Sequence, residues 1–284
     1  MKRGSYLWVM VLLGLTVLAI AVERPAAETT ECTVIPSLPY TISTQGIYCL
    51  KSNLSTSITA GNAITINTNN VVIDLNGFKI GGLGAGPLTT AYGIYAFGRQ
   101  NITIRNGTVR GFRHGITLGD ESPFTTSQGH IIEDIRADLN VFSGMEITGR
   151  GNIIRTNQII TTVAFVASEA HGIVVTGPGN RVLNNDVYET RKTGAVGDAM
   201  GIYLLYADDC VVDGNRVGNT AIGSEWATGI YIVNSADVLV SNNRIAAMDY
   251  GVRFLNGGTG KYRDTLTSGV TYPYTGGDNA GNNN

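Results

Sequence analysis

The chain is poor in charge. Charged residues make up only 15% of its 284 residues, the formal net charge is −2, and no run of lysine or arginine stands out. Domains that bind nucleic acid carry a basic patch or stripe, so we expect no nucleic-acid partner. Beyond the N-terminal segment no stretch shows convincing helical periodicity, which argues against helical fold classes. The 37 glycines, together with segments of alternating valine and isoleucine, instead indicate many short strands joined by tight turns.

Cysteine is scarce, with three residues in the whole chain. Cys32 and Cys49 are 17 residues apart, and we expect them to form a disulfide in an oxidising compartment. Closing a loop of that length contributes about 3 kcal/mol to stability. Cys210 lies at an inward position of an alternating segment, so we expect a core thiol rather than a nucleophile.

Only one long apolar run is present, and it lies at the N-terminus. Lys2 and Arg3 precede an apolar stretch over residues 6–22, which ends in small residues suited to cleavage. We interpret residues 1–27 as a signal peptide, with a retained membrane anchor as the alternative. A secreted, periplasmic or cell-envelope location follows, with no membrane contact after cleavage.

An internal repeat is the strongest pattern in the chain. A glycine followed by an aliphatic residue recurs at intervals of 22, 29, 28, 29, 28 and 22 residues. These pairs begin at Gly93, Gly115, Gly144, Gly172, Gly201, Gly229 and Gly251. A period of this length indicates stacked supersecondary units, each too small to bury its own apolar face.

Each unit reads as three short strands with period-two alternation, so that one face of each strand is buried. Three strands per coil predict an all-β fold, a right-handed single-stranded parallel β-helix of about eight coils over residues 61–270. We expect residues 28–60 to form an N-terminal cap and residues 271–284 to be a disordered tail. A last coil with unpaired strands would favour self-association.

Two sets of side chains should form columns along the helix axis. One turn position holds Asn157, Asn185, Asn215 and Asn243, whose amides can hydrogen-bond between coils about 4.8 Å apart. The inward position of the first strand forms the core. It holds Ala96, Leu118, Ile147, Val175, Leu204, Ile232 and Phe254.

Two segments resemble a known group of proteins. Residues 71–78 (VVIDLNGF) and 104–112 (IRNGTVRGF) look like secreted bacterial right-handed β-helix proteins of the pectin-lyase-like superfamily, and residues 38–50 resemble their N-terminal cap. The resemblance covers roughly residues 31–270 and implies the fold. The superfamily includes polysaccharide lyases, glycoside hydrolases, esterases, epimerases and non-catalytic surface proteins, so an activity has to be argued from individual residues.

The catalytic templates of that superfamily fit this chain poorly. Polygalacturonase-like hydrolases resemble one another in an Asp-Asp that precedes a Gly-His-Gly, whereas here the His-Gly pairs at His114 and His171 precede Asp208-Asp209. Pectate-lyase-like chemistry needs clustered carboxylates that hold a cation. Asp209 and Asp237 align in adjacent coils, but the arginine motif of that group is missing. We expect no cofactor, with calcium at these two aspartates as the alternative.

The outward column of the first strand offers a surface for a sugar. It holds Tyr203, Tyr231 and Arg253 in consecutive coils, with Glu146 earlier in the same column. Consecutive tyrosines can present an aromatic surface to a sugar ring. Alternatively, they stack across coils and simply cover the sheet. We take Tyr203, Tyr231 and Arg253 as candidate substrate-binding residues.

Three long connections border this column. They span approximately residues 161–171, 189–200 and 219–228. Long insertions in a repeat usually gather on one functional face. They carry Trp226, our best single candidate for a sugar platform, and Glu169 close to His171. A histidine beside Glu169 or Glu146 can act as a general base near neutral pH. We therefore take Glu146, His171 and Glu169 as candidate catalytic residues, the alternative being that His171 is a hydrogen-bonded turn residue.

The sequence therefore predicts a secreted β-helix protein that binds extracellular polysaccharide along its first sheet and loop wall. It leaves open whether the protein also cleaves the polymer as a lyase or a glycoside hydrolase, and sugar epimerisation is a third reading. The alternative is a non-catalytic structural or adhesive protein of the cell envelope, whose stacked coils serve as a rigid partner surface.

Overall fold

The structure is a computed structural model that describes residues 31–164, 169–193, 198–220 and 226–283. The predicted signal peptide, residues 1–27, lies outside these ranges. Residues from Cys32 onward form one compact unit. Within the described ranges, no helix has the length and the apolar character needed to cross a bilayer.

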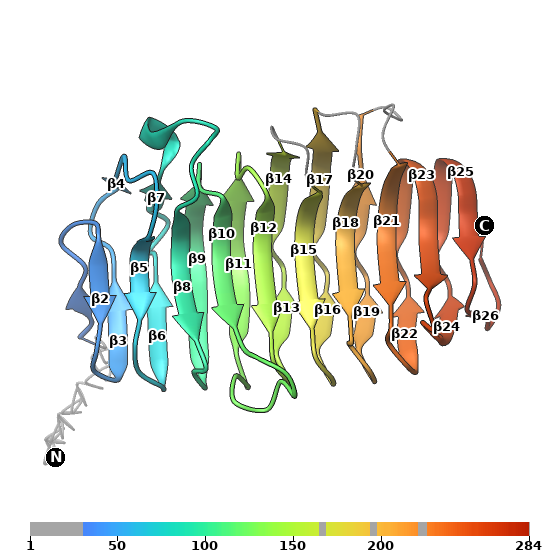
Figure 1. The fold of residues 1–284 in the computed structure, drawn as a ribbon, viewed down its shortest axis with the longest axis horizontal. Helices are drawn as coiled ribbons and strands as arrows, with labels where there is room; N and C mark the ends of the chain where they lie inside the picture. The colour runs from blue at the N-terminus through green and yellow to red at the C-terminus, as the bar shows by residue number, and fades with distance from the viewer. Residues whose placement is uncertain (1–30, 165–168, 194–197, 221–225, 284) are drawn as a thin grey trace, which may run out of the picture. The chain divides into compact units, whose positions relative to one another are not determined.

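Three parallel sheets run along this unit, one for each side of a coil (Figure 1). The first sheet carries the candidate site. Its strands are β2 (Tyr40–Ile42), β5 (Asn62–Ile66), β8 (Tyr92–Phe97), β10 (His114–Gly119), β12 (Ser143–Thr148), β15 (Ala170–Thr176), β18 (Asp198–Leu205), β21 (Trp226–Val233) and the second halves of β23 (Arg244–Leu255) and β25 (Leu266–Thr275). Each strand pairs in parallel with the strand one coil later, as a β-helix requires.

The second and third sheets complete each coil. The second consists of β1 (Thr33–Val34), β3 (Gly46–Cys49), β6 (Val71–Asp74), the first halves of β9 (Ile102–Arg110) and β11 (Ile131–Asp138), β13 (Ile153–Arg155), β16 (Arg181–Leu183), β19 (Val211–Asp213), β22 (Val238–Ser241), β24 (Gly260–Arg263) and β26 (Asp278–Asn279). The third consists of β4 (Leu54–Ser55), β7 (Lys79–Gly81), the second halves of β9 and β11, β14 (Gln158–Ala164), β17 (Asp186–Lys192), β20 (Arg216–Gly218) and the first halves of β23 and β25. A short 3₁₀ turn, η1 (Leu83–Ala85), follows β7.

The inward column expected from the sequence is confirmed. Every residue assigned to it, from Ala96 to Phe254, is buried, and the strand register places consecutive members side by side. The repeat glycine allows the coils to approach this closely. A Cβ on Gly172 would clash with the carbonyl oxygen of Gly201 in the next coil and with a methyl group of Val187. A larger residue at this position would therefore force the coils apart.

The asparagine column is also confirmed. The Oδ1 of each of Asn185, Asn215 and Asn243 accepts the backbone N–H and the side-chain amide N–H of the asparagine one coil earlier, at 2.9–3.0 Å. All four asparagines are buried. The column therefore satisfies polar groups at a corner of the helix that water does not reach.

A second polar column escaped the sequence analysis, because its residue type changes from coil to coil. His130 Nδ1 accepts the backbone N–H of Ile102 at 3.1 Å, and Asn152 Oδ1 accepts that of His130 at 2.9 Å. Asn180 and Cys210 continue the column, with the Cys210 Sγ accepting the Asn180 N–H at 3.2 Å. Burial raises the pKa of Cys210 to about 12, so this thiol is a structural acceptor and not a nucleophile.

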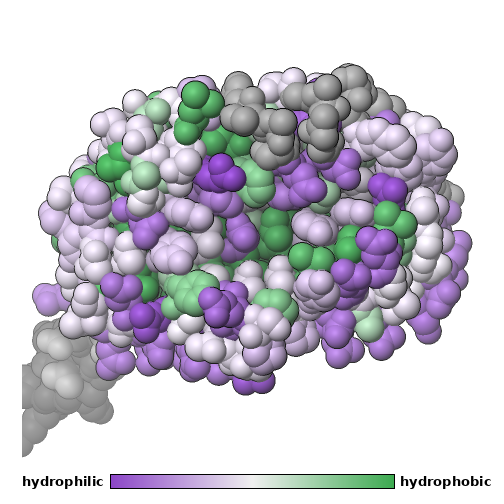
Figure 2. Space-filling model, viewed as in Figure 1, coloured by the Kyte–Doolittle hydropathy of each residue, from purple (hydrophilic) through white to green (hydrophobic). Residues whose placement is uncertain are grey.

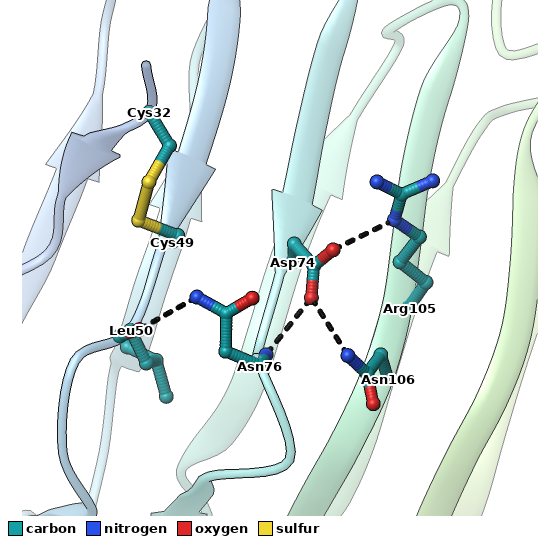
Figure 3. Close-up of a disulfide and its surroundings, with 7 residues drawn as sticks. All are labelled: Cys32, Cys49, Leu50, Asp74, Asn76, Arg105 and Asn106. Carbon is teal, nitrogen blue, oxygen red and sulfur yellow. Dashed lines mark hydrogen bonds and ion pairs between the residues drawn. A yellow bond between two sulfur atoms is a disulfide. The ribbon is translucent and has the colours of Figure 1, made fainter. Parts of the chain in front are cut away.

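The disulfide between Cys32 and Cys49 is confirmed, with its Cα atoms 5.7 Å apart (Figure 3). It joins the segment before β1 to the end of β3, the strand that β1 pairs with. One coil further, Asp74 accepts hydrogen bonds from Arg105 and Asn106 and caps its own turn at the Asn76 N–H (Figure 3). The N-terminal end is therefore tied together covalently and by charge.

The β-helix is longer at both ends than the sequence predicts. Strands β2, β3 and β4 form a coil inside the segment expected to be only a cap. At the other end, the second half of β25 and all of β26 lie within residues 271–284, the segment expected to be a disordered tail. Ring stacking explains this difference. The ring centroid of Tyr272 lies 5.0 Å from that of Tyr250 one coil earlier, and the ring centroids of Tyr274 and Tyr262, which belong to different sheets, lie 4.6 Å apart. The backbone of Gly277 packs on the Phe254 ring and covers the core there.

Candidate functional site

The outward column of the first sheet has the register expected from the sequence. Glu146 aligns with Val174, Val174 with Tyr203, Tyr203 with Tyr231, and Tyr231 with Arg253. The rings of the two tyrosines stack with centroids 5.5 Å apart and planes 20° from parallel. The face drawn in Figure 2 mixes hydrophilic and hydrophobic residues, and no large continuous apolar area covers it.

This stacking changes what the tyrosines offer to a ligand. Because their flat faces lie against each other along the axis, the half-buried rings expose edges and hydroxyl groups instead of an aromatic platform. Burial, followed by the charge of Glu169, raises the pKa of Tyr203 to about 12. Both hydroxyls therefore stay protonated at neutral pH and can donate hydrogen bonds.

Arg253 closes the tyrosine column. Its Cζ lies 4.1 Å from the ring centroid of Tyr250 and 5.5 Å from that of Tyr231, so the guanidinium is held by cation–π contacts. Its Nε is buried without a hydrogen-bond partner. In the described part of the chain no carboxylate lies within ion-pair distance of Arg253. The residue is therefore a cation held in place by aromatic rings.

His171 and Glu169 are brought together, as the sequence suggested. His171 Nε2 lies 3.2 Å from Glu169 Oε2, and this contact lowers the pKa of Glu169. The imidazole packs at 5.5 Å against Tyr203 and at 5.2 Å against Phe142, and only 3% of the residue is exposed. A histidine this deeply buried can hold Glu169 in its ionised form, but it cannot reach a polymer on the surface.

Asp198 belongs to the second long connection, and the sequence did not single it out as a candidate site residue. Ala170 aligns with Ala199, so Glu169, just before β15, and Asp198, the first residue of β18, are neighbours, and the charge of Glu169 acts on Asp198. Burial and then the charge of Glu169 raise the pKa of Asp198, against the opposing charges of Arg253, Lys192 and His171. Two neighbouring carboxyls with pKa values shifted apart are the usual signature of an acid and a base.

Glu146 is not part of that pair. It aligns with Val174, five residues beyond Glu169, which is about 16 Å along the strand at about 3.3 Å per residue. Its carboxylate lies 2.9 Å from His114 Nδ1. Arg113 Nε lies 3.3 Å from His114 Nε2, so both ring nitrogens of this histidine have polar neighbours.

The carboxylate of Glu146 is held ionised by this arrangement. Burial raises its pKa, but the His114 hydrogen bond and the nearby charges of His114, His171 and Arg113 outweigh burial and lower it. Since both nitrogens of His114 are engaged, with Ser143 Oγ a further 2.8 Å contact of Nδ1, this histidine is a positioning residue.

Trp226 lies beside the carboxylate pair and not in the tyrosine column. It aligns with Asp198, and its ring stacks on Tyr250 at 6.0 Å. The residue is 59% exposed, the largest exposed aromatic in the described ranges. Of the sequence candidates it is the one available to a sugar ring. Glu225, the acidic residue before it, lies outside the described residues.

The predicted loop wall is partly a sheet. Strands β14 and β17 continue to Ala164 and Lys192, and their extensions pair from Thr162↔Thr190 to Ala164↔Lys192. The middle parts of all three long connections, residues 165–168, 194–197 and 221–225, lie outside the described ranges. The described residues that flank these gaps include Glu169, Asp198 and Trp226, so the wall borders the site.

No group of three or more histidine, cysteine, aspartate or glutamate residues that could hold a metal ion occurs within the described ranges. The two aspartates weighed as a calcium site, Asp209 and Asp237, both adopt positive φ at successive turns, and the Asp209 N–H bonds to the carbonyl oxygen of Ala236. Their local geometry is thus that of β-helix corners.

A family model described as "Right handed beta helix region" matches residues 92–267, more than half of the chain. Among solved structures, the enzymatically active domain of bacteriophage CBA120 tailspike protein 2 is similar at 14% identity, with a TM-score of 0.54, over 86% of this chain and 41% of that one. The full-length tailspike protein 2 from Escherichia coli O157:H7 bacteriophage CAB120 is similar at 14% identity, with a TM-score of 0.51, over 84% of this chain and 34% of that one. This chain thus spans less than half of these proteins.

Pectate lyase Pel9A is similar at 14% identity, with a TM-score of 0.49, over 81% of this chain and 69% of that enzyme. The search among curated proteins found no matching sequence. Identities this low concern the fold and not the chemistry. The family match and the coil architecture agree on the right-handed parallel β-helix that the sequence predicts. The chain therefore belongs to the right-handed β-helix family.

Proposed function

We propose that the protein binds an extracellular polysaccharide across its first sheet and hydrolyses it with Glu169 and Asp198 as the reacting pair. The observation that carries the proposal is the placement of these two carboxyls side by side, with the exposed Trp226 next to them in the same register. This position combines a proton donor, an ionised carboxylate and a surface for a sugar ring.

The shifted pKa values assign the roles. Asp198, whose pKa is raised, keeps its proton longer and acts as the general acid, and Glu169, whose pKa is lowered, acts as the nucleophile. Adjacent strands are about 4.8 Å apart. That spacing resembles the separation of about 5–5.5 Å between the carboxyls of retaining glycosidases more than the 6.5–9.5 Å or so of inverting ones.

The reaction then has two steps. Asp198 gives its proton to the leaving oxygen as the glycosidic bond breaks, while Glu169 forms a bond to the anomeric carbon. Water next displaces Glu169 and returns a proton to Asp198. His171 acts through Glu169 as a positioning residue, because it is buried and 3.2 Å from that carboxylate.

The remaining sequence candidates hold the polymer. Trp226 stacks on one sugar, and the hydroxyls of Tyr203 and Tyr231 donate to sugar oxygens further along the strand. Arg253 offers a cation beside these hydroxyls. Glu146, two coils before Tyr203 in the same column, accepts hydrogen bonds from sugar hydroxyls. The disulfide supports a periplasmic or secreted location, where such polymers occur.

The test is a panel of polysaccharides incubated with the chain lacking residues 1–27, with release of reducing ends as the readout. We expect turnover of at least one polymer, and a loss of about 10²–10⁴-fold in rate for Glu169→Gln and for Asp198→Asn. Glu133→Gln is the matched control, because this outward carboxylate of the second sheet pairs with Arg155 away from the site. It should leave the rate unchanged.

Each outcome decides between two functions. A non-catalytic adhesive role is the second candidate. It is favoured by the burial of all three histidines, which lie within the described ranges, because none of them faces the surface as a general base. Glycan binding without turnover would support that role and refute the hydrolase. If the protein neither bound nor cleaved any polymer of the panel, the polysaccharide proposal would be overturned altogether.

A further inference from the structure

A groove of about 680 Å³ lies on the outward face of the third sheet, on a different side of the coil from the first sheet. Its walls and floor come from five consecutive strands, β14, β17, β20, β23 and β25. The proposed active site uses none of these residues. The groove therefore needs an explanation of its own.

Small side chains make the floor of the groove. Gly218, Ala246 and Ser268 occupy one outward column in consecutive coils. Tyr188 stands at one end of this column and Leu266 flanks the other, and they are 43% and 38% exposed. The groove is therefore a strip with a shallow apolar floor and an exposed aromatic ring at one end.

The neighbouring column is cationic. Arg216 aligns with Arg244, so these two arginines lie on strands that are about 4.8 Å apart along the axis. The side chain of Arg216 is 73% exposed and reaches Asp186 at 3.2 Å. Arg244 is exposed and has no ion-pair partner in the part of the chain that the structure describes. In a chain of net charge −2 this is a local positive edge.

We propose that this groove binds an acidic polysaccharide, with the chain lying along the helix axis and its carboxylate or sulfate groups on Arg216 and Arg244. Charge complementarity selects an anionic ligand, and guanidinium groups bind such planar or tetrahedral anions well. The small floor and Tyr188 suit the apolar C–H faces of sugar rings.

A peptide fits this groove less well than a glycan. The groove lies on the face of a sheet whose backbone groups already bond to the coils before and after. An extended peptide gains affinity mainly by adding to a free strand edge, which a sheet face does not provide. A sugar polymer needs no backbone partner and presents anionic groups at regular intervals.

The test measures binding of heparin, an acidic glycan, with uncharged dextran and poly-glutamate as comparison ligands. Arg216→Gln/Arg244→Gln should weaken heparin binding by about tenfold for each arginine. The control Arg105→Gln/Arg263→Gln removes the same charge from the second sheet, where each arginine pairs with its own aspartate. This control should leave heparin affinity within about twofold of the wild type.

A second variant separates the groove from its charge. Ala246→Trp fills the floor without changing any charge, and Ala246 is exposed, so the fold should tolerate it. We expect it to weaken heparin binding about as much as one arginine change. The proposal would be overturned if Ala246→Trp bound heparin as tightly as the wild type. It would also be overturned if Arg105→Gln/Arg263→Gln lost as much affinity as the groove variant, because heparin would then respond only to the overall charge of the protein.

Two further outcomes would also overturn it. Poly-glutamate binding as tightly as heparin would point to an acidic protein partner. A dimer in sedimentation that the two arginine changes convert to a monomer would make the groove a contact with a second copy of the chain. Trp226→Ala and Glu169→Gln belong to the first sheet and should not alter heparin binding, so this test does not depend on the proposed hydrolase.

Discussion

Two columns of the same β-helix differ in whether one residue type recurs from coil to coil. In the asparagine column, Asn157 to Asn243, one residue type recurs in every coil, each side chain is buried and each amide is satisfied by the next. In the column that holds Glu169, Asp198 and Trp226, three different residues follow one another. Two of them have shifted pKa values and the third is exposed.

The difference follows from what each column has to do. A repeated amide forms a continuous chain of hydrogen bonds, so it stabilises the corner and leaves nothing for a ligand. In the column of Glu169, Asp198 and Trp226, the charge of Glu169 instead perturbs the carboxyl of Asp198, and Trp226 beside them stays exposed. In a β-helix the regular positions therefore build the fold, and departures from the repeat indicate where function lies.

The largest effect should come from breaking the site column. Glu169→Gln removes the ionised carboxylate but keeps its shape, and turnover should fall by about 10²–10⁴-fold while glycan affinity changes little. The kcat and KM of the variant on the active polymer test this. A change confined to KM would assign Glu169 to binding and contradict the catalytic role.

Breaking the asparagine column should cost stability and not activity. Asn215→Ala removes the acceptor for two N–H groups of Asn185 and leaves them buried, so unfolding free energy should drop by about 3 kcal/mol. Denaturant unfolding measures the loss. Asn67→Ala, at an exposed asparagine outside both columns, is the control and should change stability by less than about 0.5 kcal/mol. Equal losses of stability in the two variants would contradict the claim that the hydrogen bonds of the asparagine column stabilise the fold.

The mixed polar column should make stability depend on pH. Burial lowers the pKa of His130 to about 4, from 6.5 in the unfolded chain. Between these values the unfolded chain binds the proton and the folded chain does not, so stability is full above about pH 6.5 and is lost as pH falls towards 4. The loss at pH 4 should reach about 3 kcal/mol.

His130→Asn sharpens this test, because asparagine is the residue that follows in the column at Asn152 and Asn180. The variant should lack the His130 contribution, and its unfolding free energy should change less than that of the wild type between pH 7 and pH 4. Identical pH dependence in both proteins would show that His130 titrates normally.

The smallest effect should come from Trp226→Ala. Loss of one exposed aromatic contact should weaken glycan binding by about tenfold. Phe97→Ala is the matched control, since Phe97 is an exposed aromatic of the first sheet several coils earlier. If both changes weaken binding equally, the polymer does not lie across Trp226.

Much of this architecture could be predicted from sequence, since identical residues at equal spacing need only the period to align. The Gly-Ile pairs and the four asparagines are examples. The His130–Cys210 column could not, because its members share a hydrogen-bond role and not a residue type. Asp198 was hidden for a related reason. Its neighbour Glu169 lies 29 positions earlier across two long connections, and only the register Ala170↔Ala199 brings them together.

A titration of the carboxyls of Glu169 and Asp198 tests the proposed active site most directly. Carbon-13 NMR of labelled side chains, assigned with Glu169→Gln and Asp198→Asn, gives both pKa values without any substrate. We expect Asp198 to titrate above its ordinary 3.8 and Glu169 below its ordinary 4.5, with the Asp198 pKa falling once Glu169 is replaced. Ordinary pKa values for both groups, unchanged in the partner's variant, would contradict the coupled pair and with it the proposed active site.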